Sequence, residues 1–332
     1  MGEFDLIERF FKCPARQATV GIGDDCAILQ PHPGTQWAIS SDMLVEGRHF
    51  LSTVNPRHLG HKALAVNLSD LAACGAKPLA FTLALALPRA DEAWLAPFSE
   101  GLFALADAHG CELIGGDTTQ GPLNICITVF GEVPVVNGRT QALLRSGARA
   151  GDDLYVSGTL GDARLALEVF RGTVSVPGPI FEAARLRMET PTPRVALGQA
   201  LRGVASSAID VSDGLLGDLG HILKQSHVGA TVNADIATTL IASKPTSTWD
   251  NDQKHSSISL TQWRRWALTG GDDYELLFTA PPDAREAVAN AARDSLTTVT
   301  RIGHIDAEPG LRVLDSEGQR LPNTDASFDH FA

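Results

Sequence analysis

The chain has 332 residues, enough for two domains, because a single hydrophobic core stops growing at about 250 to 300 residues. Hydrophobic residues make up 44% of the chain and charged residues 20%, a composition typical of a globular protein. The formal net charge of −12 argues against a surface for nucleic acid or anionic membrane, since no basic patch offsets it.

The five cysteines are scattered along the chain, and no two of them form a C-x-x-C pair. This usage is typical of reduced thiols in a cytosolic protein. The chain does not begin with a basic region followed by an apolar one, and no apolar run approaches the roughly 18 residues of a membrane span. We therefore expect a soluble, cytoplasmic protein without a membrane segment.

The first half of the chain alternates between strand and helix patterns. Residues 20–29 predict a strand, a glycine turn and a second strand, and residues 37–42 predict a strand that enters a loop. Pro56 opens a predicted helix that runs to about Cys74. The other predicted elements are a strand over 79–87, a helix over 91–109, a strand over 111–114, a turn over 115–119 and a strand over 124–133.

One face of the predicted helix after Pro56 carries an acid at the end of an apolar stripe. Leu59, Ala63, Val66 and Asp70 follow at i, i+4, i+7 and i+11, so they share this face. Burying a lone carboxylate is costly unless it meets a metal ion or a hydrogen-bond donor. Asp70 is therefore the strongest single candidate for a metal ligand.

The stretch between residues 135 and 153 is basic and rich in glycine, and we place the domain boundary here, giving domains of residues 1–138 and 139–332. The second half then predicts a strand over 154–157, helices over 163–170, 179–188 and 193–201, and a strand over 206–210. Asp213 is predicted to cap the next helix, which runs to about residue 225. A polar insertion over 243–259, a helix that packs its indoles at Trp263 and Trp266, and a glycine turn over 270–274 follow.

Six aspartates follow or end apolar stretches beside glycine, serine or another aspartate: Asp25, Asp42, Asp70, Asp117, Asp210 and Asp213. Each alone is compatible with ordinary turn or cap chemistry. Carboxylates that converge repel one another unless cations lie among them. Hard oxygen ligands without a Cys or His cluster select Mg²⁺ or Mn²⁺, and Mg²⁺ is usually shared with substrate phosphates.

The sequence contains no P-loop and no dinucleotide-binding fingerprint. A nucleotide must therefore be held by glycine turns, by helix N-termini and by bridging Mg²⁺ ions. Arg145 could add a direct charge-assisted hydrogen bond, although its spacing is equally compatible with a solvated linker arginine.

Seven short segments, in order from residue 2 onward, together resemble the motifs of the thiamine-monophosphate kinase family. They are Gly2-Glu3-Phe4, residues 21–27, Ser41-Asp42 followed by 45–50, residues 65–73, Gly115-Gly116-Asp117-Thr118, residues 210–215 and residues 270–276. This resemblance implies the α+β fold of the aminoimidazole-ribonucleotide-synthetase-like ATP-binding superfamily. It also implies a homodimer formed by the N-terminal α/β halves, a C-terminal α+β half, and ATP bound between the two domains.

The resemblance also implies the reaction and its residues. ATP and thiamine monophosphate would give thiamine diphosphate and ADP. Carried over by position, the ligands of several Mg²⁺ ions would be Asp25, Ser40, Ser41, Asp42, Asp70, Asp117, Asp210 and Asp213. The ATP contacts would be Gly116, Asp117, Arg145 and Ser212. The contacts to thiamine phosphate would be His49, Asp272 and Phe328. Asp272 stands where the family often has Glu, and Phe328 stands where Trp also occurs but keeps an aromatic face for a cationic ring.

The residue types fit this reaction because the acceptor is a phosphate oxygen. A phosphomonoester has a second pKa of about 6, so the acceptor is ionised at neutral pH and needs no general base. We therefore expect no catalytic base or nucleophile. Catalysis should consist of positioning two polyanions in line and neutralising their charge.

Three other functions remain open at this point. The first is the activity of another enzyme of the same superfamily. Selenophosphate synthetase would require a reactive Cys and a Lys in a glycine-rich N-terminal loop. The hydrogenase-maturation relative would require a C-terminal Cys, whereas this chain ends in His330-Phe331-Ala332. A nucleotide or metal sensor would keep the ligands and show no turnover. A metal-assisted phosphatase would release phosphate without a thiamine acceptor.

Overall fold

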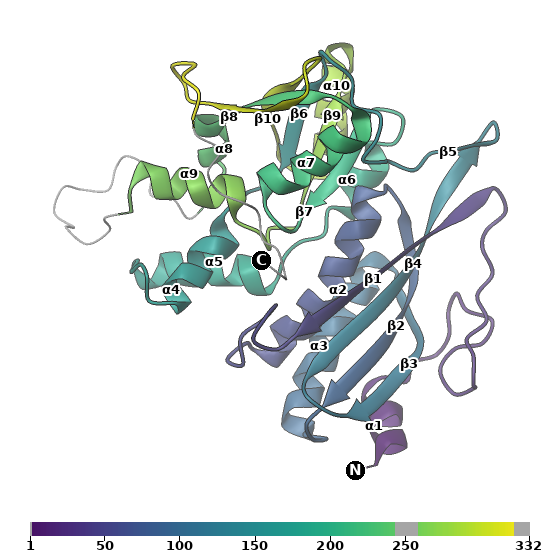
Figure 1. The fold of residues 1–332 in the computed structure, drawn as a ribbon. Coiled ribbons are helices and arrows are strands. Elements are labelled where there is room, and N and C mark those ends of the chain that lie inside the picture. The colour runs from purple at the N-terminus through teal and green to yellow at the C-terminus, as the bar shows by residue number, and fades with distance from the viewer. Residues whose placement is uncertain (1, 243–257, 322–332) are drawn as a thin grey trace. The chain divides into compact units, whose positions relative to one another are not determined.

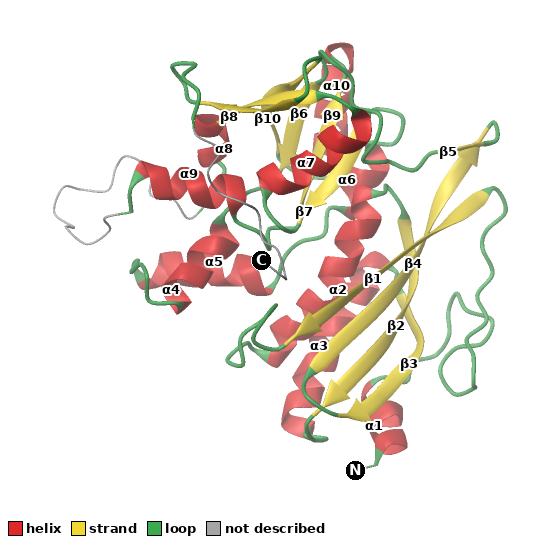
Figure 2. Cartoon of the chain, in the orientation of Figure 1, coloured by secondary structure: helices red, strands yellow, loops and turns green. Residues whose placement is uncertain are grey.

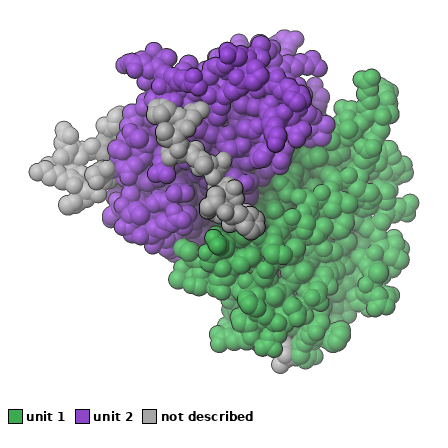
Figure 3. Space-filling view, in the orientation of Figure 1, with its two compact units in different colours: residues 1–142 green, residues 143–332 purple. Residues whose placement is uncertain are grey.

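The computed structural model describes residues 2–242 and 258–321. The chain divides into two compact units, residues 1–142 and 143–332 (Figures 1 and 3). Phe328 and all but the last two residues of the predicted insertion over 243–259 lie outside the described residues.

Unit 1 contains a mixed sheet in the strand order β1-β4-β2-β3, with β5 paired to β4. β2 runs parallel to β3, and β4 is antiparallel to both β1 and β2. The elements are α1 Glu3–Phe10, β1 Thr35–Val45, α2 Pro56–Ala73, β2 Lys77–Leu87, α3 Glu92–His109, β3 Glu112–Gln120, β4 Asn124–Val136 and β5 Arg139–Thr140.

Helices α2 and α3 pack together and cover one face of this sheet (Figure 2). Both begin at local signals that the sequence carries. Asn55 accepts a hydrogen bond from the Arg57 N–H and Pro56 occupies the first turn of α2, while the Asp91 side chain accepts from the Ala93 N–H. The predicted helices after Pro56 and Asp91 are confirmed.

Unit 2 contains a six-stranded sheet in the order β11-β8-β10-β6-β9-β7, in which only β11 and β8 pair in parallel. Its strands are β6 Asp153–Ser157, β7 Ser207–Val211, β8 Gly229–Asn233, β9 Glu275–Ala280, β10 Val299–Asp306 and β11 Gly310–Leu314. Its helices are α4 Asp162–Phe170, α5 Gly178–Glu189, α6 Val195–Ala200, α7 Leu215–Ser226, α8 Ala234–Thr238, α9 Leu260–Thr269, the short 3-10 turn η1 Pro282–Ala284 and α10 Arg285–Asp294.

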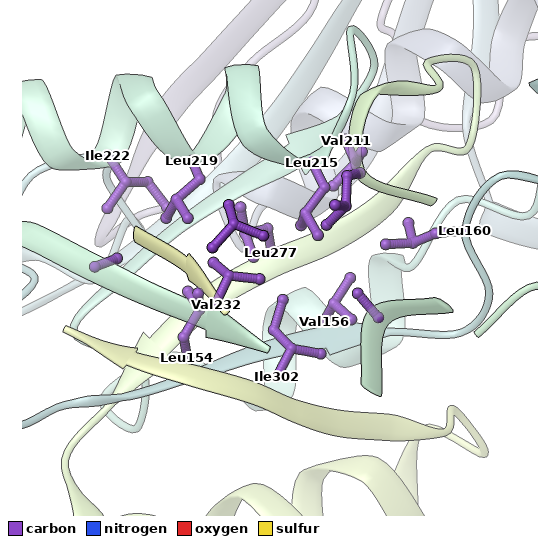
Figure 4. Close-up of a cluster of buried hydrophobic side chains, with 14 of the residues drawn as sticks. Leu154, Val156, Leu160, Val211, Leu215, Leu219, Ile222, Val232, Leu277 and Ile302 are labelled. Carbon is purple, nitrogen blue, oxygen red and sulfur yellow. The ribbon is translucent and has the colours of Figure 1, made fainter. Parts of the chain in front are cut away.

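The core of unit 2 lies between α7 and the sheet. Leu215, Leu219 and Ile222 of α7 are fully buried and pack with apolar side chains of the strands, among them Val211 and Leu277 (Figure 4). Because α7 is fixed by these contacts, the loop between β7 and α7 has a rigid support on both sides.

Three sequence predictions differ from the structure. The predicted turn over 115–119 is wrong: these residues belong to β3, because they pair with residues 82–86 of β2. Residues 20–29 form only isolated bridges, between Val20 and Ile28 and between Ile22 and Asp24, instead of two strands. Asp213 does not cap α7, whose N-cap is Gly214 without a side-chain hydrogen bond.

The indole packing predicted for the helix at 263–266 is confirmed. Trp263 and Trp266 of α9 are buried and meet edge to face. None of the described helices is long and apolar enough to cross a membrane.

Candidate functional site

Three of the predicted metal ligands in unit 1 lie where β1 faces α2. Ser40 and Asp42 share the face of β1 that carries the buried Leu44. The Ser40 hydroxyl donates a hydrogen bond to the Asp70 carboxylate, and the Asp42 N–H donates to the Asn67 Oδ1 at 3.1 Å. The structure thus places the carboxylate at the end of the apolar stripe beside a strand, as its inward direction predicted.

Ser41 lies on the opposite face of β1. Its hydroxyl is 2.9 Å from the Thr128 Oγ1 and 3.2 Å from the Ile127 carbonyl oxygen, both on the neighbouring strand. The side chains of Ser40 and Ser41 therefore do not point to one place, although the sequence prediction groups them.

Gly116 and Asp117 lie on β3, three strands away from β1. The register connects Asp42 to Ile127, Ile127 to Leu83 and Leu83 to Gly116. Three strand spacings amount to about 14 Å, so Asp42 and Asp117 are too far apart to bind one ion directly. Gly116 has φ 146°, and a Cβ there would lie 1.8 Å from the Leu83 carbonyl oxygen, so only glycine fits.

Asp25 is exposed and lies in the long segment between α1 and β1, where its N–H donates to the Asp24 carboxylate at 2.9 Å. Two buried glutamates hold the ends of this segment. Glu112 accepts from the N–H groups of Arg16 at 2.8 Å and Gln17 at 2.7 Å. Glu132 accepts from the His32 N–H at 2.6 Å.

His49 follows β1 in a tight turn. Its Nδ1 accepts a hydrogen bond from the Val45 N–H at 3.0 Å, and its carbonyl oxygen accepts from the Lys62 ammonium at 3.4 Å. Because Nδ1 is an acceptor, a neutral His49 ring carries its proton on Nε2.

In unit 2, Asp210 lies near the end of β7 and Ser212 and Asp213 lie in the loop that follows. Asp210 is buried, while Ser212 and Asp213 are partly exposed. The adjacent N–H groups of Ser212, Asp213 and Gly214 all donate to the Oδ2 of Asp218, each at 3.1 Å. Burial raises the pKa of Asp218 to about 7, against the lowering effect of these hydrogen bonds. The sequence reasoning missed Asp218, whose signal was an acid inside the first turn of an apolar helix.

The loop before β9 packs against this same β7–α7 loop. The Asp272 N–H donates to the Ser212 carbonyl oxygen and the Tyr274 N–H to the Val211 carbonyl oxygen, both at 2.8 Å. A Cβ at Gly271 would lie 2.4 Å from the Ser212 oxygen. Two segments that the sequence prediction assigned to ATP and to substrate are therefore neighbours in unit 2.

The acids that follow Asp272 are buried and serve the fold. Asp273 accepts from the Gly161 N–H at 2.8 Å, and burial raises its pKa well above the ordinary value. Glu275 is fully buried, 2.9 Å from the Arg187 Nη2 and 2.6 Å from the Arg194 Nε. The sequence motif does not separate these supporting acids from Asp272.

Arg145 lies beside the edge of the unit 2 sheet. The carbonyl oxygen of Leu144 accepts from the Ala208 N–H of β7 at 2.9 Å, and that of Arg145 accepts from the Ser226 hydroxyl at 3.1 Å. The Arg145 main chain is thus fixed to β7 and to the end of α7, while the residue is exposed.

The donor atoms fit a hard cation such as Mg²⁺, because they are carboxylate and hydroxyl oxygens. Within residues 2–242 and 258–321, no three His, Cys, Asp or Glu side chains form a group that could hold a metal ion. Additional oxygen ligands must therefore complete any such site.

Comparison with known proteins places the chain in a class. Residues 23–133 match the N-terminal domain, and residues 149–316 the C-terminal domain, of the AIR synthase related proteins. The two units thus carry the two-domain α+β architecture of these proteins.

The full-length similarities are more specific. The chain is 45% identical to thiamine-monophosphate kinase of Salmonella typhimurium over 336 aligned residues, covering 100% of this chain and 98% of the relative. The crystal structure of thiamine-monophosphate kinase from Stenotrophomonas maltophilia is also 45% identical and superposes with a TM-score of 0.79 over 92% of each chain. A structure of AaThiL complexed with AMPPCP and TMP is 27% identical, with a TM-score of 0.73 over 91% of this chain and 89% of that one. The chain belongs to the thiamine-monophosphate kinase family.

Proposed function

We propose that the protein transfers the γ-phosphoryl group of ATP directly and in line to the phosphate of thiamine monophosphate, giving thiamine diphosphate and ADP. As a member of its family it is a thiamine-phosphate kinase. The observation that carries the proposal is the 45% identity to such a kinase over the whole chain. The complex of AaThiL with AMPPCP, an ATP analogue, and TMP supports the same pair of substrates.

The ligands proposed for several Mg²⁺ ions are the eight oxygen-bearing residues of the sequence prediction: Asp25, Ser40, Ser41, Asp42, Asp70, Asp117, Asp210 and Asp213. Bound Mg²⁺ would neutralise the charge that two phosphate groups bring together. Because Asp42 and Asp117 lie three strands apart, they would bind different ions. Oxygens of the ATP phosphates would complete ligand sets that the described side chains leave incomplete.

We further propose that Gly116, Asp117, Arg145 and Ser212 contact ATP. The main chain at Arg145 is fixed through the carbonyl oxygens of Leu144 and of Arg145 itself, so the side chain would extend toward a phosphate from a defined position. For thiamine monophosphate the proposed contacts are His49, Asp272 and Phe328. Asp272 would offer a carboxylate to the cationic thiamine, and its main chain is held by Ser212.

The residues of this chain would contribute by binding and orienting rather than by taking a proton. The acceptor phosphate is ionised at neutral pH, since its second pKa is about 6. Two anions then react without a base once they are aligned and their charge is neutralised.

The deciding experiment is an ADP-release assay with Mg²⁺ and ATP, run with thiamine monophosphate, with free thiamine and without an acceptor. We expect ADP and thiamine diphosphate, identified by chromatography, only with thiamine monophosphate. ADP release without an acceptor would point to a phosphatase instead, and no turnover under any condition would point to a sensor.

We also propose that unit 1 forms a homodimer through the open face and edge of its sheet. β1 is an edge strand, and Ile39 and Met43 on its outer face are 61% and 51% exposed. An edge strand with exposed large apolar side chains favours pairing with a second copy. Light scattering after chromatography should show a dimer for the wild type and a monomer for an Ile39→Lys, Met43→Lys double variant.

We propose a cytoplasmic location, which the thiol usage supports. All five cysteines are free, and burial raises the pKa of the Cys111 thiol, which keeps that thiol protonated and unreactive. Cell fractionation of a tagged chain would test the location.

A further inference from the structure

The loop between β7 and α7 has its donors directed at a single buried oxygen. Asp218 lies in the first turn of α7 and is only 3% exposed. Its Oδ2 accepts hydrogen bonds from three consecutive N–H groups, those of Ser212, Asp213 and Gly214, at 3.1 Å each. The carboxylate therefore closes the loop onto the helix that follows it.

Consecutive N–H groups at the start of a helix usually form a binding site for an external anion such as a phosphate. Here the Oδ2 of Asp218 takes the place of that anion, so these three donors are not available to ATP. This differs from the expectation that the N–H groups of such turns bind the triphosphate. In this loop, the side chains of Ser212 and Asp213, rather than the main-chain N–H groups, would therefore bind the nucleotide and its metal ions.

The carbonyl side of the same loop is also held. The Ser212 carbonyl oxygen accepts a hydrogen bond from the Asp272 N–H at 2.8 Å, and the Val211 carbonyl oxygen accepts one from the Tyr274 N–H at 2.8 Å. Asp218 on one side and the segment 272–274 on the other thus fix the main chain at Ser212. A ligand-bearing loop held on both sides loses little conformational entropy when it binds.

We propose that Asp218 is a positioning residue: its buried carboxyl group fills the loop's own anion site and thereby holds Ser212 and Asp213 where they bind ATP and Mg²⁺. The inference rests on the proposed function, which assigns those two residues to nucleotide and metal binding. Asp218 itself touches neither the substrates nor the ions.

The test compares Asp218→Ala and Asp218→Asn in the full chain. Alanine removes the acceptor, whereas asparagine keeps one oxygen that can accept from the loop N–H groups. We expect Asp218→Ala to raise the half-saturating Mg²⁺ concentration and the KM for ATP by about tenfold, while the KM for thiamine monophosphate changes by less than about twofold. Asp218→Asn should restore most of the wild-type Mg²⁺ dependence.

The matched control is Asp152→Asn together with Asp152→Ala. Asp152 is also a buried acid of unit 2 and also accepts from a main-chain N–H, that of Arg149 at 2.9 Å, as well as from the Ser206 hydroxyl at 2.6 Å. These variants should lower thermal stability without moving the Mg²⁺ or ATP dependence. They report what loss of a buried anchor does where the anchored residue, Arg149, is not a proposed ligand, since Arg145 in the same segment is held separately through the Ser226 hydroxyl.

Two outcomes would overturn the proposal. One is an Asp218→Ala protein with wild-type Mg²⁺ and ATP dependence. The other is a loss of activity that follows only the folded fraction measured by circular dichroism, as in the Asp152 control. If the wild type forms no thiamine diphosphate, the proposed function fails. The role of Asp218 is then tested independently, by measuring the thermal shift that Mg²⁺ and ATP produce in each variant.

Discussion

The residues predicted to bind metal ions or ATP are held in two different ways. In unit 1, Ser40, Asp42 and Asp70 lie on a long strand and a long helix, where the β1–β4 register and the α2 packing set their positions. In unit 2, Ser212 and Asp213 lie on a loop whose shape depends on Asp218 and on the segment at 272–274. Ligands on regular elements need few dedicated supports, whereas ligands on a loop need them.

Asp25 is the unit 1 residue that follows the second pattern. It lies in the irregular segment before β1, which the buried Glu112 and Glu132 hold near its two ends. The contrast is therefore between ligands on regular elements and ligands on loops rather than between the two units as such. Substitutions of supporting residues should affect the loop ligands more than the strand ligands.

The largest expected effect is that of removing a ligand from a regular element. Asp70→Asn keeps an oxygen that accepts from Ser40 but lacks the charge that binds a cation, so we expect turnover to fall about 100-fold, equivalent to about 3 kcal/mol, with the fold retained. Steady-state assays and circular dichroism measure both effects.

The control is the same change at Asp107, an exposed acid of α3 that pairs with Arg16, where the effect should be small. Wild-type turnover in Asp70→Asn would remove this carboxylate from the site.

A smaller loss of activity should follow from disturbing the segment that supports the β7–α7 loop of unit 2. The Cβ of Gly271→Ala would lie 2.4 Å from the Ser212 oxygen, so one of the two loops must shift, and we expect kcat/KM to fall about tenfold. Gly220→Ala is the matched control because no described atom beyond its chain neighbours and the adjoining backbone of its own helix lies within 4 Å of its Cβ, and this helical change should stabilise by about 0.5 to 1 kcal/mol. Equal kinetics in both variants would show that the contact between the loops does not position the ligands.

A still smaller effect is expected at the loop that carries Asp25. Glu112→Gln keeps one of the two carboxylate oxygens that accept from Arg16 and Gln17, so the loop should loosen and the KM for ATP should rise about threefold. Glu100→Gln removes an exposed partner of Arg57 and should leave the KM unchanged. If the two variants have the same KM, the anchor at Glu112 does not act on Asp25.

The elements with strong local signals could be predicted from the sequence. α2 begins at Pro56 after a capping asparagine, and α3 begins after a capping aspartate and ends before Gly110 in the left-handed conformation. Such signals involve residues that are close in sequence, so they do not depend on the rest of the fold.

Features that depend on residues distant in the sequence were harder to predict from the sequence. The turn predicted at Gly115-Gly116-Asp117 is part of β3, since pairing with β2 overrides the usual preference of glycine for turns. The separate directions of Ser40 and Ser41, and the role of Asp218 as the acceptor for three loop N–H groups, required the strand register and the helix position. The identities of the candidate ligands could be proposed from motifs, but not what holds each of them.

The last expected effect concerns stability rather than activity, and it is a pH dependence at the base of the Asp272 loop. Burial raises the pKa of Asp273 well above its ordinary value, whereas an unfolded aspartate titrates near about 3.9. Above that pH the unfolded chain has released a proton that the folded chain keeps. The contribution of Asp273 to stability is therefore fully present below about pH 3.9 and falls, by up to about 1.4 kcal/mol per pH unit, until the pH passes the folded pKa.

Asp273→Asn cannot titrate and keeps an oxygen that accepts from the Gly161 N–H. Denaturant unfolding from about pH 5 to about pH 8 should therefore show the wild type losing stability relative to this variant as the pH rises. Asp153→Asn is the control of opposite sign, because the hydrogen bond from Arg285 lowers the pKa of Asp153 and its contribution is lost only as the pH falls through that lowered value. A constant difference between wild type and Asp273→Asn over this range would mean that Asp273 is ionised in the fold, so that the loop carrying Asp272 would rest on a buried charge rather than on a neutral acid.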